Sequence, residues 1–351
     1  MSASLLRPVT VLTGFLGSGK TTTLARLLKA PEFEGTVAIV NEFGEIGLDH
    51  LLLETSKERF ALLDNGCVCC TVRDDLVETL LRLDKELPAF NRVVIETTGL
   101  ADPAPILHAL MADERLAKAY GVDGVVTTVD AANGLATLAA HAQAVKQAAV
   151  ADCILVTKTD LVDEVALGAL LARLAALNPT ARVIRSRDGD APASALISSA
   201  LEAGDDAEVA DWFARASASR LRAGTHDPGC ADPRCADPRH GLRHGQDVAT
   251  FSFVLDAPVN WSAFKQWLEY LAMLKGEDLL RFKGLIHVSE KPETPVVVQG
   301  VQHVFHPPRE LAGWPSKDRR TRLVFITRNI PRDLIARTLA KFVGADLMTA
   351  T

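Results

Sequence analysis

The first part of the chain, up to about residue 200, alternates short apolar runs with longer amphipathic stretches. Amphipathic helices are predicted at 21–30, 74–87 and 164–177. Nearly continuous apolar strands separated by helices are typical of a parallel sheet covered on both faces. The sequence therefore predicts an α/β domain. The strand-like runs are 9–14, 36–41, 59–64, 92–97, 124–130, 153–158 and 182–186.

A different pattern follows. From about 187 to 247 Gly, Asp, Pro, Arg and His accumulate, and "CADPRCADPR" is a five-residue repeat. We interpret 222–247 as a linker, with a helix before it at about 207–222. A second α+β pattern then begins. It comprises strands at 248–256, 279–288, 295–308 and 322–329, and helices at 260–274 and 331–343.

Composition narrows the function classes. The net charge of −6 and the pI of about 5.9 give no support for nucleic-acid binding, whose usual footprint is a basic patch. The start of the chain lacks the apolar core of a signal peptide, and no 18 consecutive residues are apolar. We therefore expect a cytoplasmic protein, in which stable disulfides are uncommon.

The strongest motif is "GFLGSGKT", which fits G-x-x-x-x-G-K-[ST] between a predicted strand and a predicted helix. Glycines let backbone N–H groups surround phosphate, and the start of the helix adds positive potential. Lys20 is expected to reach the β- and γ-phosphates, and the Thr21 hydroxyl to bind Mg²⁺. This predicts a P-loop NTPase fold. The nucleotide-contacting residues predicted here are Gly14, Gly17, Ser18, Gly19, Lys20, Thr21 and Thr22.

Hydrolysis needs a polar group near the γ-phosphate, and "VVIETTGLADP" offers one. Glu96 ends an apolar strand, where an acid can orient the water bound to Mg²⁺ or the attacking water. Gly99 can give a backbone N–H to the γ-phosphate and move with it. The alternative is a polar strand end followed by a turn glycine.

The stretch "LVTKTD" contains residues that could distinguish a guanine nucleotide from an adenine nucleotide. The Asp160 carboxylate can accept two hydrogen bonds from guanine, and adenine offers neither of these donors. The stem of Lys158 can lie over the ring, while Thr157 stands where the more familiar motif has Asn. The alternative is a strand-to-helix turn in which Asp160 is the N-cap.

Half of the six cysteines lie within four positions, in "CVCC". Neighbouring Cys69 and Cys70 could form a disulfide only with a strained peptide, and Cys67 with Cys69 only a small, reducible ring. A nucleophilic thiol would need a partnering His, and none is nearby in the sequence. Thiolates suit Zn²⁺ or a similar ion, so a metal site is favoured over buried apolar side chains. Cys153, alone in an apolar strand, is predicted to be core.

The linker contains a second, sparser cluster of metal-ligand types, separated by three or four residues. It predicts either a loose metal-collecting site or a solvated linker with incidental Cys and His. Its members are His226, Cys230, Cys235, His240 and His244.

These motifs in this order, with "NEFGEIGLD" after the second strand, resemble the CobW-type metallochaperone GTPases. The C-terminal "LLRFKGLIHV", "VVQGVQHVFHPP" and "RLVFITRNI" are similar to that family's second domain. The resemblance covers nearly the whole chain outside the linker. It implies a GTPase domain over 1–205, a helix and Cys/His linker over 206–246, and a CobW C-terminal-like α+β domain over 247–351.

The resemblance also implies an activity: GTP hydrolysis coupled to delivery of zinc or cobalt to a client protein. It points to Glu42 as the ligand that joins Cys67, Cys69 and Cys70. Thr157 is within what the family tolerates. Alternatives are an ATPase or kinase that uses the same loop, or a passive metal-buffering activator of a metalloenzyme such as nitrile hydratase. The client, the metal and the choice between monomer and dimer stay open.

Overall fold

The computed structural model describes residues 6–40, 59–62, 71–87, 89–187 and 248–344. The chain divides into two compact units, which are described separately. Within the described ranges, no helix has the length and apolar character needed to cross a membrane.

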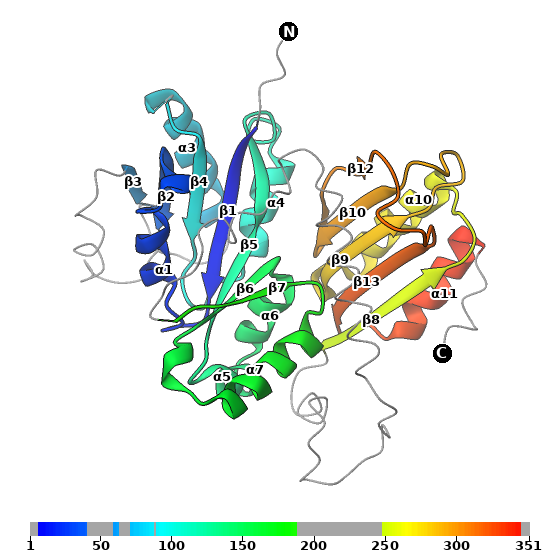
Figure 1. Ribbon diagram of the computed structural model, residues 1–351. Coiled ribbons are helices and arrows are strands. Elements are labelled where there is room, and N and C mark those ends of the chain that lie inside the picture. The colour runs from blue at the N-terminus through cyan, green and yellow to red at the C-terminus, as the bar shows by residue number, and fades with distance from the viewer. Residues whose placement is uncertain (1–5, 41–58, 63–70, 88, 188–247, 345–351) are drawn as a thin grey trace. The chain divides into compact units, whose positions relative to one another are not determined.

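The N-terminal unit is built on a seven-stranded parallel sheet with the order β3-β2-β4-β1-β5-β6-β7 (Figure 1). All of the strands predicted for this region are present. The strands are β1 Arg7–Gly14, β2 Thr36–Val40, β3 Arg59–Leu62, β4 Arg92–Glu96, β5 Tyr120–Asp130, β6 Cys153–Thr157 and β7 Arg182–Arg185.

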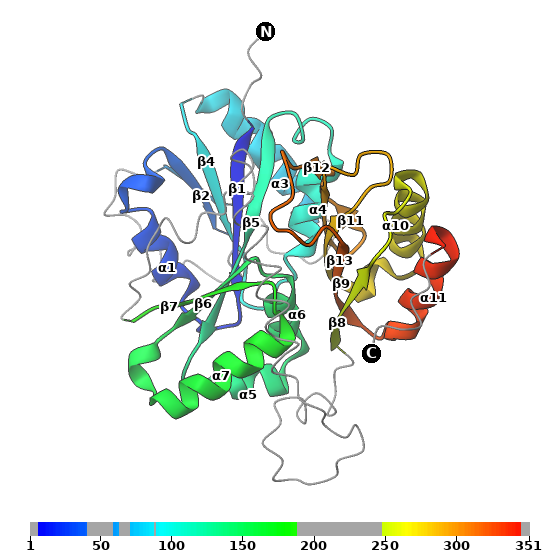
Figure 2. The same ribbon diagram turned by 45° about the vertical axis from the view of Figure 1, so that its right-hand side comes forward.

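Helices cover both faces of this sheet, as predicted. On one face α1 packs Leu24 and Leu27 against Leu12 and Val94. The two views show α4 on the other side of the central strands (Figures 1 and 2). The helices are α1 Lys20–Leu27, α3 Thr71–Glu86, α4 Ala104–Ala112, α5 Gly134–Ala140, α6 Ala142–Val150 and α7 Glu164–Leu177, with short 3₁₀ turns at Pro31–Phe33 and Thr159–Leu161.

The central strands are buried along almost their whole length, which explains their uninterrupted apolar sequence. Because the strands are parallel, their carboxyl ends meet at one edge of the sheet. Gly14, Glu96, Asp130 and Thr157 end four neighbouring strands there. Ligands of open α/β sheets bind outside this edge, so the fold brings the predicted site residues together.

Strand β5 begins four residues before the predicted run at 124, because a charge interrupts the apolar pattern. Asp123 is only 2% exposed. It accepts hydrogen bonds from Arg92 Nη1 at 2.8 Å and Thr10 Oγ1 at 2.9 Å. Burial raises the pKa of Asp123 to about 6, and Arg92 opposes this rise. The strand thus accommodates a carboxylate that its sequence alone would place in a loop.

Replacing Arg92 by leucine should cost about 3–5 kcal/mol of folding stability at neutral pH, because it leaves the buried Asp123 charge uncompensated. A carboxyl group with a raised pKa stabilises the fold below its unfolded pKa of about 4, and this contribution is lost as the pH rises through about 6. Removing Arg92 raises that pKa further. Urea unfolding should therefore show a smaller loss near pH 5 than near pH 7.5. Equal losses at both pH values would contradict the assignment, and adding Asp123→Asn should recover part of the loss.

The C-terminal unit is an antiparallel sheet with the order β11-β10-β9-β13-β8, and β12 pairs with β10. Helices α10 and α11 cover one face, and their buried side chains share a core with Phe253, Phe282 and Phe325. The elements are β8 Val248–Leu255, α10 Trp261–Lys275, β9 Leu279–Ile286, β10 Val296–Val301, β11 Val304–Phe305, β12 Arg309–Glu310, β13 Thr321–Arg328 and α11 Arg332–Val343, with a 3₁₀ turn at Gly276–Asp278.

One prediction for this unit is wrong: the run at 295–308 is a tight hairpin, not a single strand. The chain reverses between β10 and β11 at Gln302, which has a left-handed φ of 55°. The amide of Gln302 donates to Leu279 O at 2.8 Å. This long-range bond holds a turn that lacks the usual Gly or Asn signal of a tight hairpin.

Candidate functional site

The phosphate-loop sequence connects β1 to α1, which is the context predicted for it. Gly17 and Gly19 have left-handed φ angles of 70° and 93°, which other residues rarely adopt. Gly14 lies so close to β5 that an added Cβ would be 2.2 Å from Thr128 Oγ1 and 2.5 Å from Thr128 O. The glycines thus allow both the left-handed backbone of the loop and its close packing against β5.

Polar contacts hold the phosphate loop against β5 and also join residues within the loop. Ser18 Oγ lies 2.6 Å from Thr128 Oγ1, and both side chains are buried. Lys20 Nζ folds back over the loop and donates to Phe15 O at 3.3 Å. Thr22 is exposed on the first turn of α1. The loop therefore presents a preformed cradle in which the Lys20 ammonium lies near the backbone.

Glu96 and Thr21 meet at the mouth of this cradle. Thr21 Oγ1 donates to Glu96 Oε1 at 2.7 Å, and Glu96 is 4% exposed. A hydroxyl and a carboxylate are hard oxygen groups of the kind that Mg²⁺ prefers. The two residues fit a magnesium ion beside the phosphates, where Thr21 would bind it directly or Glu96 through its water.

Gly99 packs directly on the phosphate loop. A Cβ at Gly99 would lie 2.8 Å from Leu16 N and 2.5 Å from Leu16 Cδ2. The loop after β4 thus comes close enough to the phosphate loop for its backbone to respond to a γ-phosphate. Any side chain at this position would push the two loops apart.

The "TKTD" residues also border the phosphate loop. Buried Thr157 donates through Oγ1 to Ser18 O at 2.8 Å. Lys158 Nζ donates to Gly17 O at 2.8 Å. Asp160 is exposed. The stretch expected to recognise the base therefore lies beside the one expected to hold phosphate.

The alternative for Asp160, that it is the N-cap of the next helix, is wrong. Asp160 lies inside the 3₁₀ turn Thr159–Leu161, and Lys158 precedes that turn with a left-handed φ of 56°. Asp163 instead accepts from the Ala166 amide at 2.8 Å at the start of α7. Asp160 is thus not needed to cap α7.

Asp130, at the end of β5, is a site residue that sequence reasoning missed. Its carboxylate accepts from Lys158 Nζ at 2.6 Å and from Asn133 Nδ2 at 3.1 Å. Burial acts to raise the pKa of Asp130, but the hydrogen bonds from Lys158 and Asn133 hold it below its usual value. Asp130 therefore stays ionised and fixes the Lys158 ammonium. Its position after the apolar "GVVTTV" run was the available signal.

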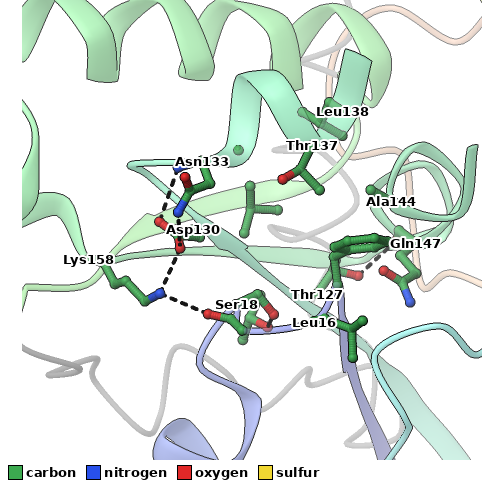
Figure 3. Close-up of a pocket in the computed structure, with 15 residues that line it drawn as sticks. Leu16, Ser18, Thr127, Asp130, Asn133, Thr137, Leu138, Ala144, Gln147 and Lys158 are labelled. Atoms are coloured by element: carbon green, nitrogen blue, oxygen red, sulfur yellow. Dashed lines mark hydrogen bonds and ion pairs between the residues drawn. The ribbon is translucent and has the colours of Figure 1, made fainter. Parts of the chain in front are cut away.

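A cavity of about 230 Å³ lies behind the phosphate loop and between β5, α5 and α6 (Figure 3). In Figure 3, Lys158, Asp130 and Asn133 lie along one side of it, and Gln147 and Leu16 lie on the other. The cavity is thus lined by Lys158 of the "TKTD" stretch and by Leu16 and Gln147, which both lie close to Gly99.

The predicted transition-metal ligands lie outside the described residues. This holds for Glu42, Cys67, Cys69 and Cys70, and for the linker set His226, Cys230, Cys235, His240 and His244. Among the residues that are described, no group of three or more His, Cys, Asp or Glu side chains could hold a metal. Cys153 is buried in the core, as predicted.

Comparison with known families agrees with this geometry. Residues 8–185 match the model "CobW/HypB/UreG, nucleotide-binding domain", and residues 248–343 match "Cobalamin synthesis protein cobW C-terminal domain". The two matches cover the residues that form the parallel sheet and the antiparallel sheet.

Similar proteins match over most of their length. The chain is 31% identical to the zinc chaperone YjiA of Escherichia coli, over 95% of this chain and 97% of that protein. It is 29% identical to zinc-regulated GTPase metalloprotein activator 1 of Schizosaccharomyces pombe, over 93% of this chain and 83% of that one. The crystal structure of Zn(II)-bound YjiA GTPase from E. coli has a TM-score of 0.70 and 27% identity, covering 96% of this chain and 99% of that one. The phosphate loop, the second-domain sheet and these matches together show that the chain belongs to the CobW/HypB/UreG family of nucleotide-binding proteins.

Proposed function

We propose that this protein is a GTPase that binds zinc and delivers it to a client protein in a nucleotide-dependent way. The observation that carries the nucleotide part is the pair of contacts from Thr157 and Lys158 to Ser18 and Gly17. These contacts join a phosphate-binding loop to a stretch whose carboxylate can select guanine.

The site residues have separate roles in this proposal. Lys20 and the loop amides bind the β- and γ-phosphates, and Asp160 accepts from the guanine N–H groups. Glu96 orients the attacking water or the water bound to Mg²⁺. The Gly99 N–H donates a hydrogen bond to the γ-phosphate, so the loop responds to its presence. Thr97 Oγ1 donates to Thr13 Oγ1 at 2.8 Å, which ties to β1 the start of the loop between β4 and α4, residues 97–103, called the Gly99 loop below. In this proposal, GTP hydrolysis and the position of the Gly99 loop are therefore linked.

The zinc part rests on the Cys-x-Cys-Cys sequence and on the relatives named zinc chaperones. Cys67, Cys69 and Cys70 lie between β3 and α3, and Glu42 follows β2. In this parallel sheet the chain leaves β2 and β3 at the same edge as the phosphate loop. This topology supports the proposal that ligands in the segments that follow β2 and β3 respond to the nucleotide. Zinc is preferred to cobalt because the relatives' names specify zinc.

Delivery requires a partner, and the activator relatives imply a client metalloprotein. We propose that the client docks on the GTPase domain, on the C-terminal domain or on both. The domain limits at 205 and 246 and a cytoplasmic location stay predictions, and both a monomer and a dimer fit the proposal.

Guanine preference is the expected result of a competition assay. Unlabelled GTP should displace a labelled GTP analogue at least about 100-fold more effectively than ATP, because one carboxylate makes two charge-assisted hydrogen bonds worth about 1.5–3 kcal/mol each. Asp160→Ala should remove most of that preference. Asp163→Ala, which removes a cap near by, should keep it. Equal displacement by ATP in the wild type would favour an ATPase or kinase instead.

A further inference from the structure

Helix α6 carries an amide that binds the Gly99 loop directly. Gln147 is 0% exposed, and its Nε2 donates to Gly99 O at 3.2 Å and to Ala101 O at 3.0 Å. A side-chain NH₂ group has two donors, so one glutamine can hold two carbonyls of the same loop. The contact joins α6 to a loop more than forty residues earlier in the chain.

The same helix grips this loop at a second point. Lys146, the neighbour of Gln147, forms an ion pair with Asp102. Asp102 also accepts from the Ala104 amide at 3.0 Å, at the start of α4. The Gly99–Asp102 segment is therefore held from α6 by both a neutral amide and a charge.

Helix α6 is itself attached to the phosphate-binding edge of the sheet. The ring of His141, at the start of the helix, stacks on Phe15 of the phosphate loop with centroids 4.5 Å apart. The Gln147 backbone carbonyl accepts from Thr127 Oγ1 of β5 at 2.8 Å. Helix α6 thus bridges the phosphate loop, β5 and the Gly99 loop.

Gln147 does not satisfy all of its own hydrogen bonds in this arrangement. Within the described part of the chain, its buried Oε1 has no hydrogen-bond partner. A buried acceptor left unsatisfied carries a free-energy cost, so packing alone does not explain a glutamine here. The donor half of the amide, which is used twice, is the part that the fold requires.

We propose that Gln147 is a positioning residue for GTP hydrolysis, which rests on the proposed GTPase function. Gly99 has no side chain to restrict its backbone, so its N–H can point in many directions. The bonds to the carbonyls of Gly99 and Ala101 anchor the peptide units that follow this N–H, and so limit its directions while Gly99 packs against Leu16 of the phosphate loop. Gln147 thereby sets where the Gly99 N–H meets the γ-phosphate, although it does not touch the nucleotide itself.

Gln147→Met keeps the length of the side chain and removes both donors. We expect kcat for GTP hydrolysis to fall about 10- to 100-fold, because small misplacements of catalytic groups have effects of this size. Affinity for GDP, which lacks the γ-phosphate, should change less than twofold. Gln143→Met, one turn earlier on α6, is the control and should keep wild-type kcat and GDP affinity.

Hydrogen–deuterium exchange of the nucleotide-free variant separates this proposal from the proposed function. The Gly99 loop of Gln147→Met should exchange about tenfold or more faster than in wild type, whether or not the protein hydrolyses GTP. Faster exchange together with reduced kcat and unchanged GDP affinity supports the positioning role. A wild-type kcat in the folded variant, unchanged exchange, or an equal loss of GDP affinity would each overturn it. A wild type with no GTP hydrolysis refutes both the proposed function and the catalytic role, while exchange still decides the tether.

Discussion

Glu96→Gln should lower kcat for GTP hydrolysis by about 10²–10⁴-fold, the range that a positioned acid–base group supplies. Glutamine has the same shape and can still accept the hydrogen bond from Thr21 Oγ1, which is 2.7 Å from Glu96 Oε1. It lacks the negative charge that orients water beside the γ-phosphate. Steady-state phosphate release and GTP titration, measured separately, should show a loss in kcat with little loss of GTP affinity.

Glu164→Gln is the matched control, because Glu164 starts α7 and its side chain is 83% exposed. This variant should hydrolyse GTP at the wild-type rate. A Glu96→Gln protein that retains kcat within about threefold would show that the carboxylate is not needed for the chemistry. Glu96 would then be only a buried partner of Thr21.

The second large effect is expected at the cysteine cluster. Replacing both Cys69 and Cys70 by serine should weaken zinc binding by about 10³-fold or more, because apparent zinc-site energies of about 10–16 kcal/mol are shared among about four ligands. A serine hydroxyl is not ionised at neutral pH and is a poor zinc ligand. Zinc titration against a chelating indicator measures the change. GTP affinity without metal should stay at the wild-type value.

Two controls sharpen this result. Cys153→Ala changes a core cysteine and should leave zinc affinity intact. Replacing His226, Cys230 and Cys235 tests the linker cluster in the same titration. If the Cys69/Cys70 variant binds zinc as tightly as wild type while the linker variant does not, the cargo site lies in the linker.

The sequence predicted most of the fold because its signals are local. An apolar run such as 153–158 identifies a strand in the absence of its neighbours, and the phosphate loop carries its own turn chemistry. The failure at the Gln302 turn has a non-local cause. The turn has no Gly or Asn, and the hydrogen bond that holds it runs from the Gln302 amide to the distant Leu279 carbonyl.

The missed site residues act across long distances in the sequence. Asp130 is defined by Lys158, 28 positions later, and Gln147 by Gly99, 48 positions earlier. Neither forms a motif, because the partners come together only when the sheet and α6 have formed. Asp160 and Asp163 are both plausible caps by composition, and only the folded turn shows that Asp163 bonds to the start of α7.

Affinity for a non-hydrolysable GTP analogue, titrated with and without saturating Zn²⁺ at constant Mg²⁺, measures the proposed coupling directly. If the GTP state completes the zinc site, each ligand must tighten the other by the same factor, typically about 5- to 150-fold. We expect the analogue to bind tighter by such a factor in the presence of Zn²⁺, and the effect to vanish in the Cys69/Cys70 variant. Equal affinities with and without Zn²⁺ in the wild-type protein would contradict nucleotide-dependent delivery.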